Sequence, residues 1–106
     1  MTHLSPIFSN LELLVIRWAE ARKIIPNATP TSQLLKLMSE LGELADAEGK
    51  KNLPEIKDAV GDVLVCLINY CALKDITVVD CLFGAYKEIE HRTGTLMPDG
   101  TFVKDN

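Results

Sequence analysis

The chain has 106 residues, of which 47% are hydrophobic and 25% charged, and its net charge is −4 at pH 7. This length suits one domain with a modest core, which favours association with further copies, and the apolar fraction argues against disorder. The lack of a basic stripe argues against a nucleic-acid surface, which needs many Lys or Arg side chains on one face.

Helical periodicity of the apolar residues predicts four helices, over residues 9–25, 30–48, 54–74 and 77–92. Pro26 interrupts the chain after the first helix, and Thr29 is placed to cap the second. The third helix has too many apolar positions for one narrow stripe, so we expect it to be central. Thr77, followed three residues later by Asp80, is typical of a capping arrangement at the start of the fourth.

The C-terminal segment 95–106 has no helical pattern. Pro98-Asp99-Gly100 is a turn sequence between two short extended pieces, which predicts a small hairpin or an ordered arm. The whole chain, residues 1–106, is therefore predicted to be one all-α domain, a four-helix bundle with a short C-terminal arm.

The composition also indicates a cytoplasmic protein that does not enter a membrane. Residues 1–6 lack the charged start and apolar stretch of a signal peptide. The longest apolar segment, 63–73, is interrupted by Asn69 and is too short to cross a bilayer. The three cysteines match no zinc-binding spacing, which predicts reduced, buried thiols at Cys66, Cys71 and Cys81.

Two pairs of acidic residues interrupt otherwise apolar helix faces. Glu40 and Glu43 lie in the second predicted helix, and Asp58 and Asp62 lie in the third. Acids three or four residues apart project from the same side of a helix. Carboxylates that converge from two helices are costly to desolvate unless a cation compensates them, and a hard divalent ion such as Mg²⁺ fits oxygen ligands. The alternative is that these acids are ordinary exposed surface charges.

Glu40-x-x-Glu43, followed by Asp58-x-x-Gly61-Asp62-Val-Leu, resembles the MazG-like branch of the all-α nucleoside triphosphate pyrophosphohydrolases, in particular its short phage and bacterial members. The resemblance implies a homodimer or dimer of dimers that cleaves a (d)NTP between the α and β phosphates. The products are a (d)NMP and pyrophosphate, and the role is nucleotide-pool house-cleaning. Mg²⁺ is the implied cofactor, with Mn²⁺ as a substitute.

The same resemblance implies the roles of the four acids. Glu40, Glu43, Asp58 and Asp62 would hold the metal, and Glu43, with Glu40 beside it, would orient and deprotonate the attacking water. The family has Glu where this chain has Ala59, and Asp58 is the acid positioned to replace it.

The nucleotide would be bound by six further residues: Trp18, Lys36, Asn69, Lys87, His91 and Arg92. Trp18 is expected to stack on the base, or else to belong to the core. Asn69 would contact a base edge or sugar hydroxyl, or be a buried amide satisfied within the bundle. The basic residues would hold phosphates or, alternatively, be solvated surface charges.

Two other functions remain open at this point. A phosphoribosyl-ATP pyrophosphohydrolase shares the bundle and the carboxylates, although its pattern fits the C-terminal segment less well. A non-catalytic helical interaction module with a degenerate site is favoured by Ala59. Release of pyrophosphate from a nucleotide separates the enzymes from the module.

Overall fold

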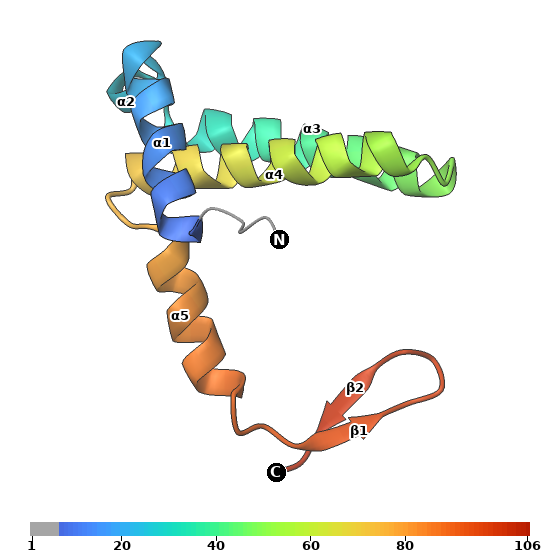
Figure 1. The fold of residues 1–106 in the computed structure, drawn as a ribbon. Coiled ribbons are helices and arrows are strands. Elements are labelled where there is room, and N and C mark those ends of the chain that lie inside the picture. Colours follow the sequence, from blue (N-terminus) through green and yellow to red (C-terminus); the bar gives the residue numbers. More distant parts are fainter. Residues whose placement is uncertain (1–6) are drawn as a thin grey trace, which may run out of the picture.

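The structure is a computed structural model that describes residues 7–106. The expectation about a signal peptide falls on residues 1–6, which lie outside the described residues. Figure 1 shows helices followed by a small hairpin. The elements are α1 (Phe8–Ala21), α2 (Ile24–Asn27), α3 (Pro30–Gly49), α4 (Leu53–Leu73), α5 (Val78–Ile89), β1 (Gly94–Leu96) and β2 (Phe102–Lys104).

The first helix is shorter than its apolar pattern predicts. α1 ends at Ala21 rather than near Ile25, because Lys23 adopts a left-handed backbone conformation with φ 64°. Such a conformation cannot continue a right-handed helix and commonly ends one. α2 is only a single turn, and Thr29 then caps α3 by accepting a hydrogen bond from the Ser32 N–H at 3.0 Å.

The helices α3 and α4 form a long helical hairpin, in which they lie side by side over most of their length (Figure 1). Asn52, in the turn between them, caps the N-terminus of α4, and its Oδ1 accepts a hydrogen bond from the Glu55 N–H at 3.2 Å. This hairpin is the scaffold on which both acidic pairs are carried.

The core lies where α1 crosses the end of the hairpin. Ile68, Cys71 and Val78 are buried there, and Val15 and Ile16 of α1 pack against them. Burial raises the pKa of the Cys66 and Cys71 thiols, which keeps them protonated and unreactive. Cys81 is exposed instead, so the prediction of three buried thiols is wrong for this residue.

The buried carboxylate of Glu12 joins α1 to the start of α5. Its Oε2 accepts a hydrogen bond from the Val78 N–H at 2.6 Å, and its Oε1 accepts one from the Val79 N–H at 3.1 Å. Beyond this point α5 leaves the hairpin, and the described part of the chain shows no contact between α5 and α3 (Figure 1). The predicted mostly helical fold is confirmed, but a single chain does not close four helices around one core.

The C-terminal segment forms the expected hairpin. β1 and β2 pair antiparallel, with Thr95 opposite Val103. Gly100 has φ 91° in the turn, and the Asp99 carboxylate accepts the Thr101 N–H at 2.9 Å, which lowers the pKa of Asp99. A Cβ at Gly94 would overlap the Phe102 ring, so only glycine fits at that position.

The molecule is extended for its size. Its radius of gyration is 16.7 Å, against about 13 Å for a compact domain of this length. It exposes 8226 Å², whereas a compact protein of 11.7 kDa exposes about 5,900 Å². None of the helices in residues 7–106 is long and apolar enough to cross a membrane.

Candidate metal and nucleotide site

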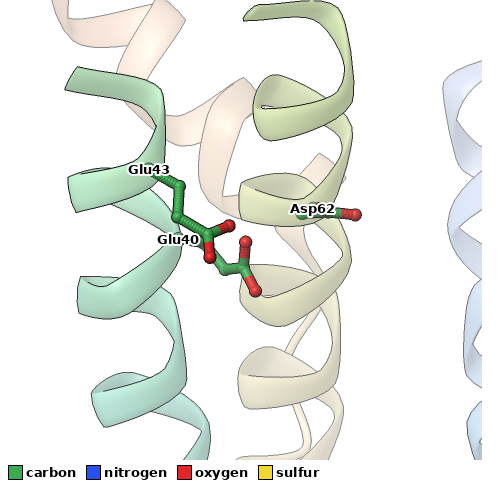
Figure 2. A group of neighbouring side chains, drawn as sticks. All are labelled: Glu40, Glu43 and Asp62. Carbon is green, nitrogen blue, oxygen red and sulfur yellow. The ribbon is translucent and has the colours of Figure 1, made fainter. Parts of the chain in front are cut away.

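Three acidic side chains come close together on the two long helices, although Asp62 is directed away from α3 in the view of Figure 2. Glu40 and Glu43 come from α3 and Asp62 comes from α4, and each offers an oxygen that lies within 4.8 Å of the others. Figure 2 shows the Glu40 and Glu43 carboxylates reaching into the space between the helices. The spacing of three residues places both glutamates on the face of α3 that is directed at α4. We call Glu40, Glu43 and Asp62 the acidic triad.

The acidic triad has more negative charge than its surroundings neutralise. A hydrogen bond with Glu43, partial burial, and the charges of Glu43 and Asp62 all raise the pKa of Glu40 above its ordinary value of 4.5. Lys36, whose Nζ lies 3.8 Å from Glu40 Oε1, opposes this shift without cancelling it. Glu40 Oε2 is buried and has no hydrogen-bond partner among the described residues. A hard divalent cation would satisfy this oxygen and relieve the repulsion, so the donor set fits Mg²⁺ or Mn²⁺.

A cavity of about 300 Å³ extends from the acidic triad toward the α3–α4 turn. Five of its seven lining residues are acidic, and the lining consists of Glu43, Asp46, Lys50, Glu55, Asp58, Ala59 and Asp62. Asp58 therefore faces this cavity, although it lies outside the three-residue group. The side chain of Ala59, only 5% exposed, also lines it. We call this the acidic cavity.

A second cavity, of about 420 Å³, lies against α1 and has a mostly hydrophobic lining. It is lined by Leu11, Leu14, Val15, Trp18, Asp62 and Val65. Trp18 is 44% exposed here, with the Arg22 guanidinium 4.6 Å from the centre of its ring. A flat apolar ligand could pack in this space against Trp18. We call it the apolar cavity, and Asp62 lines both cavities.

The other predicted site residues fall into two groups. Asn69 is 3% exposed and its Oδ1 has no hydrogen-bond partner in residues 7–106, so the expectation of an amide satisfied within the bundle is not met. Lys87 pairs with Glu90 at 2.7 Å, and His91 Nε2 lies 3.3 Å from the same carboxylate. These two residues and Arg92 follow the course of α5 away from α3, so one chain does not bring them to the acidic triad (Figure 1).

Sequence reasoning missed Asp46, Lys50 and Glu55. A signal was available for Asp46, which lies three residues after Glu43 and so shares its helix face. Lys50 and Glu55 face the acidic cavity only because the α3–α4 turn brings them together, at 4.0 Å. Glu12 was also missed, although an acid within the apolar stripe of the first predicted helix is a signal for a buried carboxylate.

Residues 28–96 match the sequence profile of the MazG nucleotide pyrophosphohydrolase domain. The chain belongs to this family. The match spans α3, α4 and α5, so all three members of the acidic triad and every residue of the acidic cavity lie within the MazG domain. The apolar cavity draws most of its lining from α1, outside the matched segment.

A phage protein is a relative in sequence. Over 68 residues, which are 64% of this chain, the MazG-family chain is 37% identical to an uncharacterized 18.2 kDa protein from the rep-hol intergenic region of Haemophilus phage HP1. The matched segment spans 39% of that relative's length.

A solved structure has a similar fold. It is the MazG-like pyrophosphohydrolase of cyanophage S-2L, bound to dGDP and three catalytic Mn²⁺ ions per active site. The comparison gives a TM-score of 0.69, with 19% sequence identity, over 96% of this chain and 100% of the other. At this level of identity, the similarity establishes the fold shared by the two chains.

Proposed function

We propose that this chain is a divalent-metal-dependent nucleoside triphosphate pyrophosphohydrolase. Its reaction would convert a (d)NTP to a (d)NMP and pyrophosphate, and its role would be the removal of unwanted nucleotides in the cytoplasm of a bacterium or a phage-infected host. The observation that carries this proposal is the acidic triad, in which Glu40 has a raised pKa and an unpartnered buried oxygen. Membership of the MazG family supports the same reaction.

The acidic triad, with Asp58 beside it, would hold Mg²⁺, or Mn²⁺ in its place. Bound divalent ions neutralise charge on the phosphate oxygens and assist the attack of water. Glu43 is exposed at the junction of the triad and the acidic cavity, where its carboxylate would accept a proton from the attacking water. The water oxygen then bonds to the α-phosphorus, the bond from that phosphorus to the bridging oxygen breaks, and pyrophosphate leaves.

The apolar cavity is the proposed site of the nucleobase. Trp18 offers a ring for stacking within a mostly hydrophobic lining, and Asp62 connects this cavity with the acidic triad. Lys36, whose Nζ lies 3.8 Å from Glu40 Oε1, is proposed to contact a phosphate. Asn69 is buried and lines neither cavity, so its contact with the nucleotide stays a prediction.

The proposed assembly is a dimer or a dimer of dimers. The exposed surface exceeds that of a compact protein of this mass by about 2,300 Å². This excess is larger than the area that each partner buries in a standard interface, which is about 800 Å². Lys87, His91 and Arg92 lie on the part of the chain that α5 carries away from its own triad. We propose that they contact phosphates only within this assembly.

The direct test is a panel of NTPs and dNTPs incubated with the protein and Mg²⁺. The proposal expects pyrophosphate and a nucleoside monophosphate as products, with no turnover in EDTA. Release of orthophosphate would indicate a different phosphohydrolase. A folded protein that turns over none of the nucleotides would favour the interaction module instead.

The site test is Glu43→Gln, which keeps the shape of the side chain and removes the base. Turnover should fall by about 100-fold or more, the range for loss of a general base, while the circular dichroism spectrum remains helical. Glu48→Gln makes the same change at an exposed position later on α3 and should have no effect. Full activity of Glu43→Gln would contradict the assigned role.

A further inference from the structure

The acidic cavity and the apolar cavity lie on opposite sides of Asp62 along α4. The acidic cavity includes Glu55 and Asp58, which precede Asp62, and extends toward the α3–α4 turn. The apolar cavity includes Val65, which follows Asp62, and extends toward α1. A nucleotide also has two unlike ends, an aromatic base and a negatively charged phosphate chain. If the proposed function holds, these cavities therefore fix the direction in which the nucleotide lies.

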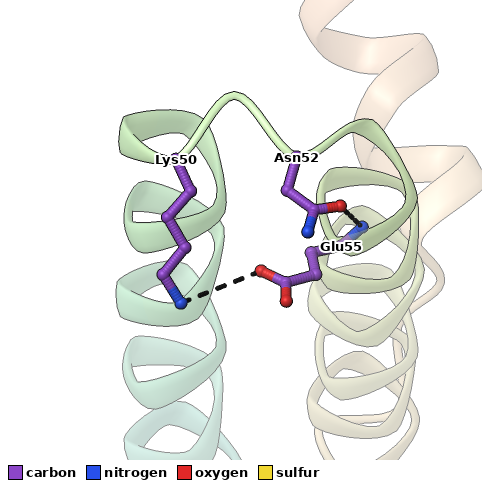
Figure 3. A network of polar contacts seen from close by, with 3 residues as sticks. All are labelled: Lys50, Asn52 and Glu55. Carbon is purple, nitrogen blue, oxygen red and sulfur yellow. Dashed lines mark hydrogen bonds and ion pairs between the residues drawn. The ribbon is translucent and has the colours of Figure 1, made fainter.

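Lys50 is the one positively charged residue that lines the acidic cavity in the described part of the chain. Lys50 is the C-cap residue of α3. It follows Glu43 by seven residues, which separates the two residues by about 10 Å along the helix axis. In Figure 3 the Lys50 side chain extends from the turn back along α3, and its Nζ lies 4.0 Å from Oε2 of Glu55 on α4. Lys50 is thus placed beyond the acidic triad, on the side away from the apolar cavity.

The Lys50–Glu55 pair is suited to exchange of partners. The two side chains are 67% and 52% exposed, and ion pairs of this kind contribute little to stability. A terminal phosphate group carries up to about two negative charges, whereas a carboxylate carries one, so it can compete with Glu55 for the Lys50 ammonium group. Since the remaining charged groups of the cavity are carboxylates, which repel a bare polyphosphate, the phosphate chain would enter as its Mg²⁺ complex.

We infer that Lys50 binds the outer phosphates of the nucleoside triphosphate, which replace Glu55 as its partner. The base lies against α1 in the apolar cavity, and the phosphates run from the acidic triad toward the α3–α4 turn. This inference rests on the proposed function and adds the direction of the substrate and the residue that holds the leaving group.

The experiment measures binding of Mg²⁺–pyrophosphate and of a nucleoside monophosphate by calorimetry. Lys50→Gln should weaken binding of Mg²⁺–pyrophosphate about five-fold, the effect of losing one exposed charged contact, and change monophosphate binding less than two-fold. Glu55→Gln should tighten pyrophosphate binding, because it frees Lys50 from its present partner. Lys57→Gln removes the same charge from an exposed residue that does not line the cavity, and it should change neither affinity. Lys50→Arg keeps the charge and should retain pyrophosphate binding.

Three results would overturn the inference. The first is that Lys50→Gln and Lys57→Gln bind pyrophosphate with equal affinity. The second is that Lys50→Gln loses pyrophosphate binding and monophosphate binding to the same extent. The third is that the unaltered protein does not bind Mg²⁺–pyrophosphate. A purely structural role for the Lys50–Glu55 pair predicts that both single variants change stability alike and leave pyrophosphate affinity unchanged. The nucleotide panel tests the proposed function separately, since turnover by the unaltered protein does not depend on which lysine holds the leaving group.

Discussion

Glu40 shows how a site residue can oppose the stability of the metal-free chain. Its raised pKa means that the native state holds the Glu40 proton more tightly than the unfolded chain does. The native state is therefore favoured at low pH, and this advantage is lost as pH rises from about 4.5 through the raised value. At neutral pH, the negative charges of Glu43 and Asp62 disfavour ionisation of Glu40 unless a cation lies among the three side chains.

Glu40→Gln should therefore stabilise the metal-free protein at pH 7 while abolishing turnover. Thermal melts in EDTA should show a higher melting temperature than that of the unaltered protein, and the difference should vanish below pH 4.5, where the carboxyl group is protonated in both states. Mg²⁺ should stabilise the unaltered protein more than the variant. A lower melting temperature of Glu40→Gln in EDTA would contradict the assigned repulsion.

Ala59 lines the acidic cavity, and the resemblance described above implies a Glu at this position in the family motif. Ala59→Glu adds a carboxylate at a residue that is only 5% exposed, so it should destabilise the metal-free protein by about 1–3 kcal/mol. Mg²⁺ should restore this loss and bind more tightly than in the unaltered protein. Urea unfolding with and without Mg²⁺ measures both effects, and a loss that Mg²⁺ does not reverse would show that the new carboxylate does not reach the metal.

At the scale of helices, the features that are determined by residues close together in the sequence could be predicted from it. The acidic pairs on α3 and α4 follow from spacings of three and four residues, and the turn at Asn52 lets the two helices face each other. The left-handed Lys23 was not predictable, because its surroundings carry no glycine or asparagine at that point. The bond from Glu12 to α5 joins residues 66 positions apart, a separation at which periodicity gives no information.

Glu12 accepts hydrogen bonds from the first two residues of α5, so a variant there tests how much these bonds contribute to stability. Glu12→Ala leaves the Val78 and Val79 N–H groups without their acceptor and should lower the free energy of unfolding by about 2–4 kcal/mol. Urea denaturation measures the loss. Glu20→Ala, an exposed glutamate later in the same helix, should change it by less than about 0.5 kcal/mol. Equal effects of the two variants would show that the Glu12 hydrogen bonds contribute no net stability.

The molecule as a whole exposes an apolar face that a single chain leaves uncovered. On α5, Leu82, Phe83 and Tyr86 are 59%, 63% and 53% exposed, and the β1–β2 hairpin adds Leu96 and Phe102. The α5 residues and the hairpin residues are two separate groups, since α5 has no contact with β1 or β2 in the described residues, and exposed apolar groups of this kind are typical of interaction surfaces. These exposed residues explain why the sequence predicted a four-helix bundle that one chain does not complete. Helical periodicity indicates that a helix has an apolar face, but it does not indicate what covers that face.

Phe83→Glu should therefore shift the protein toward monomers in sedimentation velocity experiments, because it places a charge within the apolar face of α5. Leu53→Glu makes a similar change at a comparably exposed residue beside the α3–α4 turn and should leave the association state unchanged. An unaltered protein that is already monomeric would contradict the proposed assembly, and so would an oligomer that Phe83→Glu leaves intact.

The α3–α4 hairpin also bears on the order in which the protein folds. Its contacts join residues much closer in sequence than the 66 positions between Glu12 and Val78, and contacts of smaller sequence separation form more quickly. The carboxylates of Glu40, Glu43 and Asp62 would thus be gathered before Glu12 meets the distant start of α5. Encounters between chains depend on concentration and come last. A newly made chain would accordingly assemble the proposed cation-binding centre during its own folding, ahead of the proposed association with another chain.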